Sequence, residues 1–203
     1  MTTKVPNELL EIGVLADATN FTDSILISQN ASTGTLSSAT DNVGIGDDVF
    51  AALTRGAGNV AIGKDALGAN TTANNNTAIG HDTLDANTTG AENTAIGSNA
   101  LTANTTASNN TAIGFLTLGS NTTGAFNVAT GNYALDANTE GANNVAMGYS
   151  ALSANTTAAN NVAIGYNALL VNTTGAENIA IGKGALDANT TADSNVGIGN
   201  NAL

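Results

Sequence analysis

The feature that most constrains this chain is a 17-residue repeat that runs from residue 42 to residue 203 without an insertion. The consensus reads N-(V/T)-A-I-G-x-x-A-L-x-A-N-T-T-(G/A)-x-x, and we number its positions from the asparagine. Position 1 is Asn42, Asn59, Asn76, Asn93, Asn110, Asn127, Asn144, Asn161, Asn178 and Asn195. A fixed period of this length is typical of solenoids, in which one small unit stacks on copies of itself.

The residue types within the repeat favour a short β-strand that ends in a turn. Position 2 is always β-branched and position 4 is isoleucine in eight copies, and such residues favour an extended backbone. Residues two apart face the same side of a strand, so we expect positions 2 and 4 to face the core together with the large residue at position 9. This interpretation predicts a core that includes Ile62, Ile79, Ile96, Ile113, Leu67, Leu84, Leu101 and Leu118. The glycine at position 5 should end the strand with a bend or a positive φ.

These patterns predict an all-β fold, a parallel β-roll or β-solenoid with one 17-residue coil per repeat. Gly, Asn and Thr at fixed interior positions disfavour a helical repeat. Stacked coils lie about 4.8 Å apart, which makes the repeat region roughly 45 Å long. The asparagines at positions 1 and 12 would then stack and form ladders of side-chain amides.

The chain divides into two parts at residue 42. Residues 42–203 form the expected solenoid of nine full repeats and a partial tenth. Residues 1–41 lack the repeat, and within them Ser24–Ser28 reads as a short strand. Because an open solenoid end needs cover, we expect residues 1–41 to be an N-terminal cap or attachment segment.

Composition excludes several classes of function. The net charge is −12, from 16 acidic and 4 basic residues, so a basic patch for nucleic acid cannot form. No stretch approaches the roughly 20 apolar residues of a membrane helix, so we expect no membrane insertion. Cysteine is absent, which excludes disulfides and thiolate metal sites. Aromatic residues make up only 3% of the chain, so the core of each coil must be thin.

The repeats resemble those of two related groups of surface proteins. The segments NVAIGYNAL, NTAIGSNAL and NVAIGKDAL, joined by linkers such as NTTGAEN, are similar to the head repeats of trimeric autotransporter adhesins. They resemble more closely the NTAIGYxAL…NTTG repeats of bacteriophage tail fibres. The resemblance implies a left-handed parallel β-roll, a homotrimer, and a place on the surface of a virion. It also implies that residues 1–41 contact other virion proteins. The period of 17 departs from the adhesins, whose repeats are usually shorter.

The sequence predicts no catalytic residue, no cofactor and no metal site, so we expect a protein that is not an enzyme. His81 is the only histidine, and no nucleophile–base pair can be built around it. Position 6 varies freely while its neighbours do not, so its side chains should point outward. At this position Phe115, Tyr149 and Tyr166 are candidate contacts for a host-surface glycan or protein. The alternative is that these rings only pack on their neighbours.

Two further interpretations concern association and a rival function. Small residues dominate positions 3, 8 and 11, and we expect these columns to form flat faces where neighbouring chains approach. The paired threonines at positions 13 and 14, from Thr71–Thr72 to Thr190–Thr191, suggest an ice-binding solenoid as an alternative to a phage fibre. A bacterial trimeric surface adhesin is the other alternative.

Overall fold

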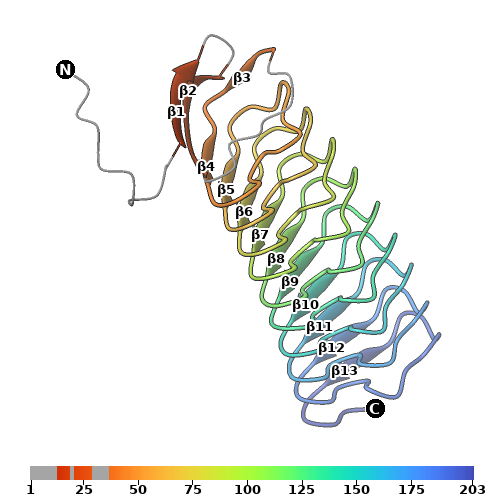
Figure 1. The fold of residues 1–203 in the computed structure, drawn as a ribbon. Coiled ribbons are helices and arrows are strands. Elements are labelled where there is room, and N and C mark those ends of the chain that lie inside the picture. Colours follow the sequence, from red (N-terminus) through yellow and green to blue (C-terminus); the bar gives the residue numbers. More distant parts are fainter. Residues whose placement is uncertain (1–12, 19–20, 29–36) are drawn as a thin grey trace.

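A computed structural model describes residues 13–18, 21–28 and 37–203, and the strands in these ranges form one sheet without any helix. The strands are β1 (Gly13–Ala18), β2 (Phe21–Ser28), β3 (Ala39–Thr40), β4 (Val43–Ile45), β5 (Val60–Ile62), β6 (Thr77–Ile79), β7 (Thr94–Ile96), β8 (Thr111–Ile113), β9 (Val128–Thr130), β10 (Val145–Met147), β11 (Val162–Ile164), β12 (Ile179–Ile181) and β13 (Val196–Ile198). Strands β4 to β13 lie side by side in sequence order along the stack (Figure 1). The predicted all-β solenoid, with one coil per repeat, is therefore confirmed.

Neighbouring coils pair in register, so each residue lies beside the residue 17 positions later. Between β6 and β7, for example, Ala78 pairs with Ala95 and Ile79 pairs with Ile96, in parallel. The backbone outside the strands also bonds from coil to coil, as in Leu84 N–H to Ala100 O (3.1 Å), Ala86 N–H to Thr102 O (3.1 Å) and Thr88 N–H to Thr105 O (2.9 Å). Hydrogen bonds thus surround the whole coil, which explains why a three-residue strand is enough to hold each repeat.

The segment before residue 42 extends the same sheet at its N-terminal end. Strand β2 pairs in parallel with β4, and β1 pairs antiparallel with β2. The predicted strand Ser24–Ser28 lies within β2 and is therefore confirmed. Residues 1–12, 19–20 and 29–36 of the expected cap or attachment segment lie outside the described residues, and its role stays a prediction.

The interior of each coil is filled by one leucine and several small or amide side chains. Leu67, Leu84, Leu101 and Leu118 are fully buried, as predicted for position 9. The alanines at position 3 are fully buried too, because the middle residue of each three-residue strand faces the interior. A Cβ added to Gly197, which occupies position 3 of the last coil, would lie 2.7 Å from Cγ of Leu186.

The prediction that the isoleucines form the core is wrong. Ile96 and Ile113 are 36% and 38% exposed, and Ile62 and Ile79 are partly exposed. Strand residues alternate between faces, so an inward position 3 places positions 2 and 4 on the outer face. The interior has no room for them, since leucine, alanine and two asparagines already fill it.

The expected packing role of the small residues also needs correction. The alanines at positions 3 and 8, such as Ala95 and Ala100, are fully buried inside their own coil and cannot face another chain. Only position 11, for example Ala86 and Ala103, is partly exposed. Small residues stand at positions 3 and 8 because each coil has a narrow cross-section.

The glycine at position 5 is required by the backbone, as predicted. Gly80 has a φ of +141°, and a Cβ there would lie 2.7 Å from the carbonyl oxygen of Gly97 in the next coil. Position 9 is less expected: Leu84 and Leu101 both have a φ of 52°, in the left-handed region that bulky residues rarely adopt. This conformation accompanies the complete burial of the leucine side chains.

Both asparagine columns form the predicted ladders. The Oδ1 atom of Asn76 accepts from the backbone N–H of Asn93 (2.9 Å), and Nδ2 of Asn93 donates to the carbonyl of Ala107 (2.9 Å). In the second column, Nδ2 of Asn104 donates to Oδ1 of Asn87 (2.9 Å) and to the same Ala107 carbonyl (3.0 Å). The two ladders meet at position 15, and each buried amide is thereby satisfied.

Candidate functional site

The largest outward feature is an apolar face on the sheet, which we call the outer face. It consists of positions 2 and 4 of strands β4 to β13, and none of its residues is charged. Sixteen of its twenty residues are apolar, and the other four are Thr77, Thr94, Thr111 and Thr130. Its most exposed members are Ile45, Ile96, Ile113, Val128, Met147, Ile179, Ile181, Val196 and Ile198. Because many large apolar side chains gather on one exposed face, the face has the character of an interaction surface.

A second feature is a row of rings that we call the aromatic strip: Phe115, Tyr133, Tyr149 and Tyr166. The ring centroids of Phe115 and Tyr133 lie 5.5 Å apart, and those of Tyr133 and Tyr149 lie 5.7 Å apart, both edge to face. Tyr149 and Tyr166 stack nearly parallel with centroids 5.5 Å apart. Phe115, Tyr149 and Tyr166 are 40%, 48% and 51% exposed, which confirms the predicted outward direction of position 6.

Tyr133 is the member of the strip that sequence reasoning missed. It stands at position 7 of its coil, whereas the other three rings stand at position 6. Its ring fills the gap left by Asn132, the residue at position 6 in that coil, and joins Phe115 to Tyr149. The residue at position 7 varies as freely as the residue at position 6, and this variation could have identified Tyr133 as a second outward-facing ring position.

A charged corner occupies the same positions in the first coils. Lys64 Nζ lies 2.6 Å from Asp65, and His81 Nδ1 lies 2.9 Å from Asp82. The hydrogen bond and charge of Asp65 raise the pKa of Lys64. In the described ranges, Asp65, His81 and Asp82 are the group whose ligand atoms come together, within 4.8 Å of one another. Because each carboxylate already has a nitrogen partner, we assign no metal ion to this corner.

Two carboxylates at position 10 are partly enclosed by the coil. Burial raises the pKa of Asp85, and the nearby charges of Asp65 and Asp82 add to the effect. Burial also raises the pKa of Asp136, whose Oδ1 atom is enclosed without a hydrogen-bond partner.

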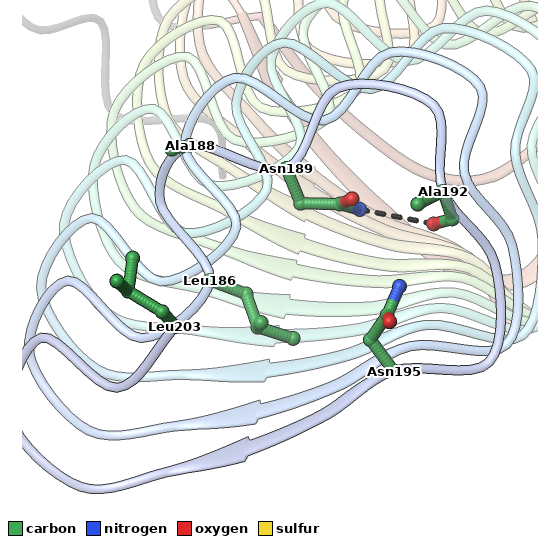
Figure 2. Close-up of a pocket in the computed structure, with 6 residues that line it drawn as sticks. All are labelled: Leu186, Ala188, Asn189, Ala192, Asn195 and Leu203. Atoms are coloured by element: carbon green, nitrogen blue, oxygen red, sulfur yellow. Dashed lines mark hydrogen bonds between the residues drawn. The ribbon is translucent and has the colours of Figure 1, made fainter.

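A hollow of about 240 Å³ opens at the last coil, lined by Leu186, Ala188, Asn189, Ala192, Asn195 and Leu203. Figure 2 shows Leu186, Asn189 and Asn195 around it, with Nδ2 of Asn189 donating to the Ala192 carbonyl (3.0 Å). Residues at the same repeat positions fill the interior of all the remaining coils. The hollow is therefore the cross-section of the coil interior, and we assign no ligand to it.

The threonine pairs do not form a free double row of hydroxyls. At position 13, Oγ1 of Thr71 donates to the Thr88 carbonyl (3.1 Å), and Oγ1 of Thr88 donates to the Thr105 carbonyl (3.0 Å). The hydroxyls at this position therefore bind backbone of the next coil. Most of the position 14 threonines, such as Thr89 and Thr106, are exposed, whereas most of those at position 13 are only partly exposed, which weakens the ice-binding alternative.

No family model, curated protein or solved structure matches this chain. In the part of the chain that the structure describes, no helix is long and apolar enough to cross a membrane. The two outward surfaces and the repeat motif are therefore the features of this chain that bear on its function.

Proposed function

We propose that this chain is a structural fibre protein of a bacteriophage virion, in which a homotrimer forms a rigid spacer and contacts the host surface. The observation that carries the proposal is the outer face, an uncharged and mostly apolar surface that runs along the solenoid over strands β4 to β13. Association of three chains through this face removes it from water.

The outer face replaces the small-residue columns as the proposed interface. A parallel trimer brings the same face of each chain to a common axis, so the side chains at positions 2 and 4 of one coil meet those of the same coil in its partners. The coil interior is thin, with one leucine per repeat, and burial of the outer face adds a second apolar layer outside it.

Charge does not oppose this assembly strongly. Each chain carries −12, but none of the acids stands at position 2 or 4 of the repeat, so none lies on the outer face. Asp85, Asp136 and Asp187 share position 10 at intervals of three coils, roughly 14 Å by strand spacing. That interval exceeds the screening length of about 8 Å at physiological salt.

The assignment to a virion is supported by the resemblance of NVAIGYNAL and NTTGAEN to phage fibre repeats. In this proposal residues 1–41 join the solenoid to other virion proteins, and the protein has no enzymatic role. A bacterial surface adhesin is the alternative that uses the same trimer.

Light scattering of the purified chain tests the assembly. A trimer has a mass near 60 kDa, three times the 19.9 kDa of one chain. A single-chain mass at micromolar concentration contradicts the trimer, and a thermal-hysteresis measurement then tests the ice-binding alternative. Antibody labelling in electron micrographs distinguishes the virion from the bacterial surface.

A further inference from the structure

We propose that the aromatic strip is a carbohydrate-binding surface that takes an extended oligosaccharide of several pyranose rings. The inference deepens the proposed contact with a host surface and rests on that function for its biological meaning. The binding chemistry itself depends only on the strip.

The first argument is concentration of a scarce residue type. The chain has three tyrosines, four phenylalanines and no tryptophan. All three tyrosines and Phe115 gather in four consecutive coils, in a continuous row of ring contacts with centroids 5.5–5.7 Å apart. The row places one exposed or partly exposed aromatic ring in each of these coils along the axis.

The second argument is that the fold does not need these rings. Position 6 holds Lys64, His81, Ser98 or Asn132 in other coils with the same backbone path. At position 7 the backbone is also the same with and without a ring, since Tyr133 has a φ of 60° and Asn167 has a φ of 57°. The rings lie outside the leucine core; Phe115, Tyr149 and Tyr166 are 40%, 48% and 51% exposed, and Tyr133 is partly exposed. The rings pack on one another, but the packing of the coil interior does not require them.

The third argument is the chemistry around the rings. In these coils the other residues at positions 6 and 7 are uncharged: Leu116, Asn132, Ser150 and Asn167. A pyranose has an apolar C–H face that stacks on an aromatic ring and hydroxyls that bond to amides and hydroxyls. Single-stranded nucleic acid also stacks on aromatic rings, but it needs a cationic groove. The basic residues are Lys4, Arg55, Lys64 and Lys183, all outside coils five to eight.

The experiment uses the full chain on an array of bacterial surface polysaccharides and linear oligosaccharides, followed by calorimetry with the glycan retained best. The test variant is Tyr149→Asn with Tyr166→Asn, because asparagine already stands at position 6 in Asn132 and Asn200. We expect binding about tenfold weaker or more, as for removal of a central aromatic contact.

The matched control is Phe126→Ser, which removes an aromatic side chain that is 60% exposed but lies outside the strip. Serine already occupies the same position, at a φ of 59°, in Ser194. The control should bind glycan as the parent chain does. Retention of no glycan, or an equal loss in both variants, overturns the inference.

Two further measurements separate this inference from the fibre proposal. If the double variant changes the mass in light scattering, the strip belongs to an interface between copies, and the glycan inference fails. Retention of oligothymidylate with equal affinity also overturns it in favour of nucleic acid. If the parent chain is a trimer but binds no glycan, the fibre proposal stands and the glycan inference fails. If the parent chain is a monomer but binds glycan, the trimer fails and the glycan inference stands.

Discussion

The coil interior and the outer face are formed by the same three-residue strands. The interior side of each strand holds a small residue, and the outer side holds larger ones. Ala112 faces the interior and is fully buried, while Ile113 beside it lies on the outer face and is 38% exposed. In most sheets with one covered side the larger apolar residue faces the core. Here one leucine and two amide ladders already fill the cross-section of the coil, so only alanine fits inward.

The contrast indicates that the two surfaces have separate tasks. The interior specifies the stack through close packing and satisfied amides. The outer face is partly covered within a single chain, and it retains exposed apolar surface. Deletions and substitutions can separate these tasks, beginning with the largest expected effect.

Deletion of residues should reveal the repeat as the unit of the interior. Removal of 93–109 brings coil 76–92 onto coil 110–126 with every column aligned, so we expect a shorter folded protein. Removal of only 93–100 moves leucines and asparagines out of their columns, and we expect no cooperative folding. Circular dichroism with thermal melting measures both. If the two deletions behave alike, the assignment of one coil to each repeat is wrong.

Aspartate placed on either side of strand β8 should separate interior from exterior directly. Ala112→Asp puts an unpaired charge inside the coil, at a cost of several kcal/mol, and should unfold the neighbouring coils. Ile113→Asp leaves its charge in water, so the monomer should stay folded while association through the outer face weakens. Thermal melting and light scattering of the two variants check this. An unfolded Ile113→Asp chain at low concentration would contradict the outward assignment.

Removal of one asparagine side chain from a ladder should lower the stability of the chain less than Ala112→Asp does. Asn104 donates to Asn87 Oδ1 and to the Ala107 carbonyl, and it accepts from Asn121 Nδ2 (3.1 Å). Asn104→Ala leaves buried groups without partners and should lower the free energy of unfolding by about 2 kcal/mol.

The control for the ladder is Asn74→Ala. Asn74 is exposed at position 16, where Ala91 and Ala125 stand in other coils. Its Oδ1 accepts only the exposed N–H of Ala57 (2.8 Å), so the loss should be well under that of Asn104→Ala. Urea unfolding measures both variants. If Asn104→Ala and Asn74→Ala lower the free energy of unfolding equally, the ladders do not stabilise the interior.

The smallest change in stability should come from substitution of Asp136, which lies on the border between the coil interior and solvent. Burial raises its pKa, so the folded state binds a proton more readily than the unfolded chain. The carboxylate therefore lowers stability at neutral pH, and this loss disappears as the pH falls through the folded pKa to below the unfolded one. Asp136→Ser introduces the residue that stands at the same position in the next coil, Ser153, and should raise Tm slightly at pH 7 and not near pH 3.

The control for Asp136 is Asp187→Ser, at the same position of a later coil. Asp136 Oδ1 has no hydrogen-bond partner, and it is the one atom of this kind among the described residues. Asp187→Ser should therefore change Tm less. A Tm difference between Asp136→Ser and the parent chain that does not depend on pH would contradict the role of burial.

The sequence by itself determined the architecture of this protein. A strict period of 17 sets coil length and register, because any other pairing would break every column at once. The β-branched residues located the strand, the glycine at position 5 marked its end, and two asparagine columns predicted the ladders. Leucine at position 9, present in nine of the ten copies, was correctly predicted to be buried.

Only the tertiary structure decided which way the strand faces and which side chains meet. In a three-residue strand the pattern Thr-Ala-Ile fits either orientation, and hydrophobicity alone favoured isoleucine inside. The space left by Leu118, Asn110 and Asn121 admits only alanine, and a sequence pattern carries no measure of that space. The aromatic strip likewise needed coordinates, because Tyr133 joins Phe115 and Tyr149 through contacts between different columns of adjacent coils.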